Sequence, residues 1–295
     1  MTIPHPIPYQ GSKRQLAEKI LQYFPSEVET LIEPFAGSAA ITLAAAQKSL
    51  AKHFVINDIN QPLMELWKEI IQNPSQIAKC YEEVWNEQLG KERDYYDLVR
   101  VRFNRYHQPT DLLYLLARCV KAAVRYNSKG EFNQGADNRR KGRMPSKMKK
   151  DILEASKLLY GRTVIHSLNF LEVAMMANDK DLVYMDPPYQ GVNKGASHRY
   201  ISGLDSCEFI DALDMLNKNN ISYILSYDGR TGTKVFGEML PSHLELMHVE
   251  IEAGTSSQST LLGKNDITFE SLYLSPALIK RMDQSEYQKQ LQLSL

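Results

Sequence analysis

The stretch Asp181-Leu-Val-Tyr-Met-Asp186-Pro187-Pro188-Tyr189 decides how this chain is interpreted. Its apolar first half predicts a buried strand, and the two prolines end that strand and begin a loop. A carboxylate, two rigid rings and an aromatic side chain at a strand end suit the binding of a planar group that carries an NH2. Asp186 and the carbonyl after it can accept hydrogen bonds from the amine, while Tyr189 can stack on the ring. Proline pairs also end strands without any such role, so the stretch needs support from other parts of the sequence.

The chain up to Asp58 carries the pattern of a nucleotide-binding βαβ unit. Leu31-Ile-Glu-Pro-Phe-Ala-Gly-Ser38 predicts a short strand, a tight glycine turn and the start of a helix. His53-Phe-Val-Ile-Asn-Asp58 predicts a second strand that ends in an acid. In such units the glycine lets the backbone approach the ligand, and the acid accepts the ribose hydroxyls. Dinucleotide sites have three glycines where this loop has one, so we expect the sparser loop of an S-adenosylmethionine site. A glycine needed only for packing would give the same local pattern.

Four blocks in this order resemble the Dam-like family of DNA adenine methyltransferases, the D12 group with alpha-class motif order. Pro8-Tyr-Gln-Gly-Ser-Lys13 resembles its N-terminal cofactor block, and Glu33-Pro-Phe-Ala-Gly-Ser38 resembles its cofactor loop. Arg125-Tyr-Asn-Ser-Lys-Gly-Glu-Phe-Asn133 resembles its DNA-recognition block. The opening stretch, from Asp186 to Tyr189, resembles its catalytic block. Together the four blocks frame nearly the whole chain.

Two positions depart from the family pattern. The family loop often has a second glycine where this chain has Ala39, so we expect a slightly less open cofactor loop. Some relatives carry a lysine that touches DNA just before the N-terminal aromatic residue, where this chain has Pro8. The recognition sequence of those relatives is therefore not transferred to this chain.

The predicted elements give an α/β fold, a doubly wound Rossmann-like methyltransferase sheet with a helical insertion between its second and third strands. Residues 1–60 and 160–280 are expected to form a discontinuous catalytic and cofactor-binding domain. Residues 61–159 are expected to form a helical target-recognition domain, and 281–295 a polar tail. Further strands are predicted at Thr163–His166, Asp181–Asp186, Ile221–Ser226, His243–Ile251 and Ile267–Leu274. Helices are predicted at Leu112–Val124, Leu171–Ala177, Asp205–Asn217 and Lys234–Leu240, among others.

The resemblance implies roles for the residues of these blocks. The catalytic block would consist of Asp186, Pro187, Pro188 and Tyr189, with Asp186 and the Pro187 carbonyl accepting the two hydrogens of the target amine. The cofactor would be contacted by Asp186 and by Tyr9, Lys13, Phe35, Ala36, Gly37, Asp58, Asn169 and Phe170. A plain hydrophobic role for Phe170 and an exposed arm around Tyr9 and Lys13 are the alternatives.

DNA contacts are expected in two neighbouring segments. In the recognition block, Tyr126 would wedge into the base stack, and its neighbours would reach base edges or phosphates: Arg125, Asn127 and Lys129. The stretch 138–150 is rich in Lys and Arg and has no acid, which is typical of phosphate binding although the formal net charge of the chain is zero. Its predicted phosphate contacts are Arg139, Arg140, Lys147 and Lys149. A solvated basic loop is the alternative for this stretch.

Composition limits the other classes of function. The chain has 295 residues, enough for a sizeable core, with no membrane-spanning run and no apolar signal region. Cys80, Cys119 and Cys207 have no metal-type spacing and cannot all pair, which is typical of the cytoplasm, and we expect a bacterial, phage or mobile-element protein. None of them follows a proline, which disfavours cytosine C5 methylation through the Pro-Cys nucleophile of that family. The histidines show no metal-type pair, so no metal is expected.

The expected function is methyl transfer from S-adenosylmethionine to the N6 amine of adenine in a specific double-stranded DNA sequence, after the base is flipped out. The nearest alternatives keep the fold and change the acceptor to N4 of cytosine or to adenine in RNA. Cytosine-amine enzymes usually have Ser in place of Asp186, and the recognition block favours duplex DNA. A catalytically silent DNA-binding protein is the other alternative, against which the intact catalytic block argues. A monomer is expected, with a cognate restriction endonuclease as a candidate partner.

Overall fold

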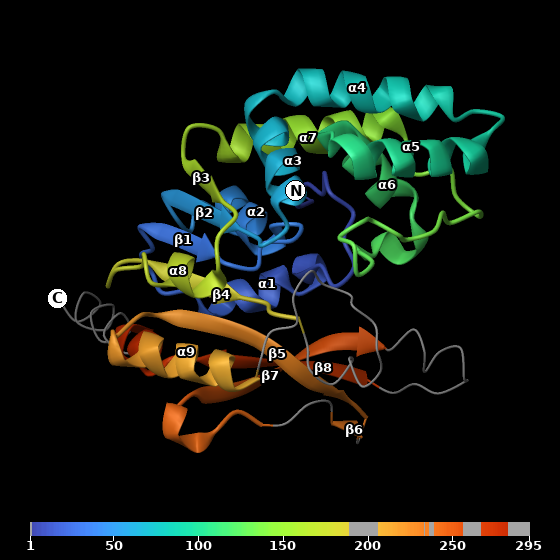
Figure 1. Ribbon diagram of the computed structural model, residues 1–295. Coiled ribbons are helices and arrows are strands. Elements are labelled where there is room, and N and C mark those ends of the chain that lie inside the picture. Colours follow the sequence, from blue (N-terminus) through green and yellow to red (C-terminus); the bar gives the residue numbers. More distant parts are fainter. Residues whose placement is uncertain (1, 189–205, 233, 236–238, 256–266, 283–295) are drawn as a thin grey trace.

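Figure 1 shows the computed structural model, which describes residues 2–188, 206–232, 234–235, 239–255 and 267–282. The strands are β1 Thr30–Glu33, β2 His53–Asn57, β3 Thr163–His166, β4 Leu182–Met185, β5 Tyr223–Thr231, β6 Lys234–Val235, β7 Met247–Thr255 and β8 Ile267–Leu274. The α-helices are α1 Ala17–Ile20, α2 Ala40–Gln47, α3 Gln61–Gln72, α4 Pro74–Glu87, α5 Glu92–Tyr106, α6 Pro109–Arg118, α7 Pro145–Leu159, α8 Phe170–Ala174 and α9 Ser206–Lys218. The short 3-10 helices among the described residues are η1 Lys13–Gln15, η2 Leu21–Tyr23, η3 Val120–Ala122 and η4 Ser242–Leu244.

The strands form a single mixed sheet in the order β3-β2-β1-β4-β5-β8-β7, with β6 paired to β5. From β3 to β5 all neighbours are parallel, while β8 is antiparallel to both β5 and β7. The chain runs outward from β1 to β2 and β3, then returns to the other side of β1 to place β4 and β5. This reversal of strand order makes the carboxyl ends of β1 and β4 the switch point, where sheets of this kind bind ligands.

Alternate residues of the central strands pack into two separate cores. On one face, Leu31 of β1 and Leu182 of β4 join a core with α1, α2 and the inserted helices. On the other face, Ile32 and Val183 pack with α8 and α9, whose Phe209 is 1% exposed. Because neighbouring residues of a strand point to opposite faces, an apolar run buried on both sides needs helices on both sides. The structure therefore confirms the α/β fold class predicted from the sequence.

The inserted helices α3 to α7 follow β2 and precede β3, as the sequence predicts (Figure 1). Their large aromatic side chains are fully buried, among them Trp67, Tyr81, Tyr96 and Tyr114. These residues belong to the same core as the first face of the sheet. The insertion is thus packed firmly against the sheet and can position what it carries relative to the strand ends.

Three predicted segments differ from the structure. The helix expected over Leu112–Val124 ends at Arg118, because Cys119 turns extended and pairs with Ala136. The helix expected over Lys234–Leu240 is replaced at its start by β6, since the Gly232 turn lets the chain fold back on β5. The strand expected over His243–Ile251 begins only at Met247, because Ser242–Leu244 form a 3-10 helix that ends at Glu245 with a φ of 51°. In the first two places, strand pairing overrides local propensity.

Candidate active site and DNA interface

Three predicted site residues follow the carboxyl ends of adjacent parallel strands. Phe35 lies just after β1, Asp58 directly after β2, and Asp186 directly after β4. Since parallel strands end at the same edge of the sheet, these side chains share one edge at the switch point. Tyr189, the last residue of the predicted catalytic block, lies outside the described residues, while Pro187 is buried and Pro188 half-buried.

The turn after β1 has a backbone that only small residues fit. Gly37 has a φ of +48°, and a Cβ added there would lie 3.0 Å from Cε1 of Tyr9. Its carbonyl accepts a hydrogen bond from the Trp67 indole at 2.9 Å. Ala39, one of the two departures from the family pattern, adopts a left-handed conformation with a φ of 46° at the start of α2. Close packing of Tyr9 against the turn therefore accounts for the glycine.

Asp58 is held by two backbone amides. Its Oδ2 accepts from Gly37 N at 3.2 Å, and its Oδ1 accepts from Asn60 N at 3.0 Å. Burial raises the pKa of Asp58 to about 6, although both amide hydrogen bonds oppose the rise. Asp58 is thus ionised above about pH 6. It lies next to the glycine turn, in the loop that the sequence analysis predicts to bind the cofactor.

The loop after β3 completes this side of the site. Phe35 and Phe170 stack with ring centroids 5.1 Å apart. Asn169 caps the start of α8 by accepting from Leu171 N at 2.9 Å, so its side chain already has a structural task. The sequence analysis did not single out Asn57, whose amide ties two loops together by donating to the Pro34 carbonyl at 2.9 Å and accepting from Leu168 N at 2.8 Å.

The carboxylate after β4 meets a buried ammonium. Lys13 Nζ lies 3.2 Å from Asp186 Oδ1 and 2.6 Å from Oε1 of Glu270, a residue of β8. Ser226 on β5 donates to the same Oε1 at 2.8 Å. Burial pulls the pKa of Lys13 down, but the Asp186 and Glu270 carboxylates outweigh it and raise the pKa. Lys13 is therefore charged, and the sequence-predicted Lys13 and Asp186 are brought together.

A second carboxyl group lies beneath the cofactor loop. Glu33 is 3% exposed, and its Oε2 accepts from the Thr42 backbone at 3.1 Å and from the Thr42 hydroxyl at 2.6 Å. Burial raises the pKa of Glu33 to about 8, with Thr42 opposing and the Asp186 charge adding to the rise. The group is thus mostly protonated at neutral pH, which no sequence signal had indicated.

The recognition block forms a tight hairpin closed by Asn127. Tyr126 and Phe132 are bridge partners, and Asn127 Oδ1 accepts from the backbone N–H groups of Lys129 at 2.9 Å and Glu131 at 3.0 Å. Its Nδ2 also donates to Glu131 Oε2 at 2.8 Å. The Asn127 amide is therefore used inside the hairpin, whereas Lys129 is exposed at the turn.

Tyr126 does not adopt the exposed position that a wedge requires. Its side chain is buried, with 6% of the residue exposed, and its hydroxyl donates to Asn60 Oδ1 at 3.2 Å. The ring meets Phe132 edge-on at 5.9 Å, which anchors the hairpin in the core. Tyr126 is thus part of the core in this structure, and its insertion into the base stack stays a prediction. Its neighbour Arg125 is half-buried, and within the described part of the chain its Nε has no hydrogen-bond partner.

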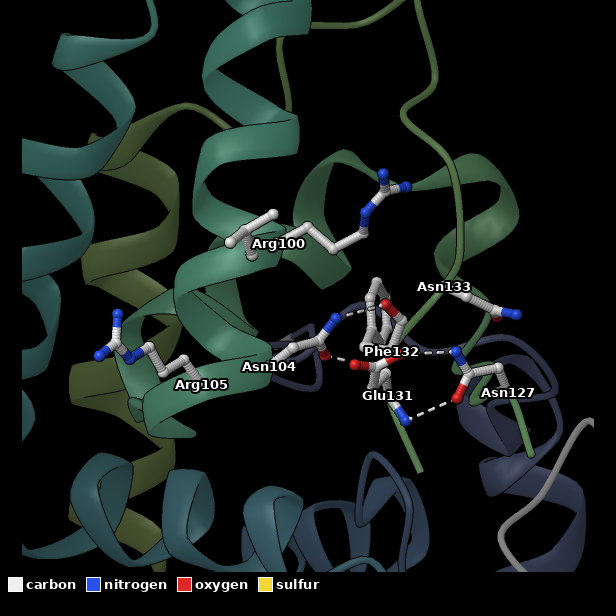
Figure 2. Close-up of a pocket in the computed structure, with 8 residues that line it drawn as sticks. Arg100, Asn104, Arg105, Asn127, Glu131, Phe132 and Asn133 are labelled. Carbon is white, nitrogen blue, oxygen red and sulfur yellow. Dashed lines mark hydrogen bonds between the residues drawn. The ribbon is translucent and has the colours of Figure 1, made fainter. Parts of the chain in front are cut away.

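A cavity of about 700 Å³ lies between α5 and this hairpin (Figure 2). The lining side chains are Arg100, Val101, Asn104, Arg105, Asn127, Glu131, Phe132 and Asn133. Asn104 holds the two walls together, since its amide donates to the Phe132 carbonyl at 3.0 Å and accepts from Phe132 N at 2.8 Å. Sequence reasoning missed this clamp because the two residues are far apart along the chain.

The basic segment divides into paired and unpaired residues. Arg139 and Arg140 approach Asp137 at 3.2 and 2.9 Å, and this acid precedes the acid-free stretch by one residue. Lys147 and Lys149 are exposed in α7 and form no ion pair with any described residue. The guanidinium of Arg139 holds the pKa of Asp137 low, at about 2. Both predicted pairs of phosphate contacts thus lie at the surface, but only the lysines are unpaired.

Other classes of site are not found in the part of the chain that the structure describes. None of its helices has the length and apolarity needed to cross a membrane. No group of three or more His, Cys, Asp or Glu residues there could hold a metal ion. Cys119, one of the three cysteines, is buried, and no disulfide joins the described cysteines.

Comparison with known proteins places these features in a family. The family model described as D12 class N6 adenine-specific DNA methyltransferase matches residues 9–253. The chain is 29% identical over 206 residues to the DNA N-6-adenine-methyltransferase of Escherichia phage P1, a match that covers 67% of this chain and 25% of that protein. It is 24% identical over 271 residues to the type II methyltransferase M1.LlaDCHI of Lactococcus lactis subsp. cremoris, covering 87% of this chain and 90% of the relative.

A third relative is the retron Ec67 DNA adenine methylase of Escherichia coli, which is 29% identical over 196 residues and covers 63% of this chain and 64% of the relative. The chain thus matches a quarter of the phage P1 protein but nine tenths of the Lactococcus protein. The family match extends from the N-terminal cofactor block to β7 and includes Asp186 and the recognition hairpin. This chain belongs to the D12 class N6 adenine-specific DNA methyltransferase family.

Proposed function

We propose that this chain transfers a methyl group from S-adenosylmethionine to N6 of adenine in a specific sequence of double-stranded DNA. The family acts on DNA and requires a methyl donor. The observation that carries the proposal is the position of Asp186, which follows β4 at the switch point and lies 3.2 Å from the buried Lys13. Asp186 would face the amine of the base, and residues 61–159 would form the target-recognition domain.

The residues around the β1 turn fit an adenosyl ligand. Gly37 brings backbone close to the site, and Asp58 offers a carboxylate to ribose hydroxyls, which are hydrogen-bond donors. The stacked Phe35 and Phe170 supply an aromatic surface for a purine ring. Lys13 supplies a positive charge where the methionine carboxylate would lie. The backbone of Ala36 and the residue that caps α8, Asn169, would flank the ligand.

The chemistry at Asp186 follows from the weakness of the amine. The lone pair of an adenine amine is delocalised into the ring, so the amine attacks poorly. If Asp186 and the Pro187 carbonyl accept its two hydrogens, the nitrogen becomes more tetrahedral and the lone pair is localised. When bound, S-adenosylmethionine supplies a sulfonium methyl, so that the new N–C bond takes the amine's lone pair while the C–S pair returns to sulfur. The methylated nitrogen carries a positive charge and is acidic, so it would release one proton to the Asp186 carboxylate that accepts its hydrogen bond. No covalent enzyme intermediate is needed.

The DNA must reach this edge of the sheet as a flipped base, because a paired adenine hides its amine inside the duplex. Pro188 and Tyr189 would line the entry and stack on the base. The hairpin with Arg125 and Lys129 would then contact the surrounding bases, and the surface Lys147 and Lys149 would contact phosphates. Because several relatives are named type II methyltransferases, we propose a cognate restriction endonuclease as a partner.

The test is incubation of the purified chain with labelled S-adenosylmethionine and one of three substrates: mixed-sequence duplex DNA, single-stranded DNA or RNA. Each substrate is then digested and the labelled nucleoside is identified. We expect N6-methyldeoxyadenosine from the duplex only. Label in N4-methyldeoxycytidine or in RNA would transfer the function to the alternative acceptors. Donor binding with no product on any substrate would indicate a catalytically silent DNA-binding protein.

A further inference from the structure

Three charged side chains from distant parts of the chain meet at the proposed reaction centre. Lys13 comes from the N-terminal segment, Asp186 from the end of β4, and Glu270 from β8. The Lys13 side chain is 8% exposed, that of Asp186 21% and that of Glu270 13%. Glu270 Oε1 approaches Lys13 Nζ at 2.6 Å and accepts from the Ser226 hydroxyl at 2.8 Å, so its position is fixed from two sides.

We propose that Glu270 is a positioning residue for methyl transfer: it anchors the Lys13 ammonium at a fixed distance from Asp186, so that Asp186 stays available to the amine. The inference rests on the proposed function and extends it to a β8 residue outside the catalytic and cofactor blocks. Glu270 does not touch the base or the donor in this account. It acts through Lys13, the group it shares with Asp186.

The physical reason is the placement of one ammonium in a poorly hydrated site. The charged Lys13 orients Asp186 through its ion pair at 3.2 Å, and Glu270, at 2.6 Å, holds the same ammonium back. Without Glu270, Lys13 would lose its closer anchor and lie nearer to Asp186, in competition with the amine.

The pH dependence of Lys13 gives the inference a readout beyond rate. The carboxylates of Asp186 and Glu270 face the ammonium, with the Glu33 carboxyl and the Tyr184 hydroxyl next to the Asp186 charge. Burial lowers the pKa of Lys13, and the two carboxylates raise it. Removing one carboxylate therefore lets Lys13 lose its proton at lower pH. Since only the charged form of Lys13 orients Asp186 through the ion pair, the alkaline limb of the rate profile should move to lower pH with it.

The experiment is single-turnover methylation of duplex DNA across a pH series by wild type, Glu270→Gln and Glu270→Asp. We expect Glu270→Gln to lower the maximal rate about tenfold or more and to shift the alkaline limb to lower pH, while affinity for S-adenosylmethionine changes less than about threefold. Glu270→Asp keeps the carboxylate, so its maximal rate and the pH of its alkaline limb should lie between those of Glu270→Gln and wild type. The control is Glu250→Gln on β7, whose carboxylate pairs with Arg230 at 2.7 Å; rate and profile should stay as in wild type.

A double mutant separates positioning from a merely structural role. In a Lys13→Met background, adding Glu270→Gln should change the residual rate by less than about threefold, because Glu270 acts through Lys13. The proposal would be overturned if the rate losses of Lys13→Met and Glu270→Gln multiplied in the double mutant. An alkaline limb that stays at the wild-type pH in Glu270→Gln would overturn it as well. If Glu270→Gln does not fold, judged by its thermal transition, Glu270→Asp and its profile decide. A wild type that methylates no duplex contradicts the proposed function itself. A methylating wild type matched by Glu270→Gln contradicts this inference alone.

Discussion

The Tyr126 hydroxyl donates a hydrogen bond to Oδ1 of Asn60 at 3.2 Å, and so joins the recognition hairpin to the loop after β2. The backbone N–H of Asn60 in turn donates to Asp58, whose other oxygen accepts from Gly37 N. A continuous line of hydrogen bonds therefore connects the hairpin to the glycine turn. The buried Tyr126 belongs to the frame of the site.

Replacing Tyr126 by Phe removes only the hydroxyl and leaves Oδ1 of Asn60 without its donor. We expect a loss of about 1 kcal/mol in the free energy of unfolding, the usual cost of such a buried hydrogen bond. Urea denaturation followed by circular dichroism measures it. The control is Tyr160→Phe, because Tyr160 is 68% exposed and should tolerate the change. Equal stability of both variants and wild type would show that the Tyr126–Asn60 bond contributes nothing.

Asp58→Asn should weaken binding of S-adenosylmethionine, because an amide oxygen accepts ribose hydroxyls less strongly than a carboxylate. Lost charged hydrogen bonds cost roughly 1.5–3 kcal/mol, about ten- to a hundredfold in affinity. Since burial raises the pKa of Asp58 to about 6, wild-type affinity should fall as the pH drops through 6, and that of the variant should not. Titration calorimetry from pH 5 to 8 checks both.

The matched control is Asp179→Asn, an exposed acid that precedes β4 and so lies at the opposite edge of the sheet. The affinity of Asp179→Asn for S-adenosylmethionine should equal that of wild type at every pH. Unchanged affinity in Asp58→Asn would remove Asp58 from the donor site.

Glu33→Gln should stabilise the fold at alkaline pH. The ordinary pKa of this carboxyl is 4.5 and burial raises it to about 8, so the folded state holds a proton that the unfolded chain has lost. The resulting stability is fully present below pH 4.5 and is lost as the pH rises towards 8, at about 1.4 kcal/mol per pH unit. Thermal unfolding at pH 5 and pH 8.5 should show a smaller decline for Glu33→Gln than for wild type. Parallel declines would mean that Glu33 is ionised in the folded state.

The surface lysines and Arg125 should affect DNA binding differently. Replacing Lys147 and Lys149 by Ala should weaken binding to all duplexes alike and flatten the salt slope by about one unit per lost phosphate contact. The same change at Arg139 and Arg140 should flatten it less, because Asp137 already pairs with both guanidinium groups. Arg125→Ala should cost about 1–3 kcal/mol, mainly on the preferred site.

Binding to the preferred duplex and to a scrambled duplex across a salt series separates these outcomes. The same uniform loss for Arg125→Ala and for the lysine variants would make Arg125 one more phosphate anchor. An undiminished salt slope in the lysine variants would leave the exposed start of α7 outside the interface.

Local patterns were sufficient to predict most strands of the sheet. The strands predicted at Thr163–His166 and Ile267–Leu274 agree with the bounds of β3 and β8. Lys234–Val235 was mispredicted as helix, since only the pairing with β5 makes it a strand.

The residues of the candidate site also divide into those that local patterns predict and those that depend on contacts distant in sequence. Asp58 and Asp186 were predictable because each is an acid that ends an apolar strand. Glu270 and Asn60 gave no such signal, since their partners lie far away in sequence. The burial of Tyr126 was also hidden, because an isolated aromatic residue in a polar loop suggests exposure. Long-range packing decides these cases.

Asp186→Ala tests the central claim most directly. The variant and wild type are given labelled S-adenosylmethionine and duplex DNA under single-turnover conditions, and labelled N6-methyldeoxyadenosine is counted, with duplex binding and thermal unfolding measured in parallel. The account predicts that wild type forms this nucleoside, while Asp186→Ala binds DNA and stays folded but transfers no measurable methyl. An Asp186→Ala rate within about tenfold of wild type, a barrier change of only about 1.4 kcal/mol, would contradict it.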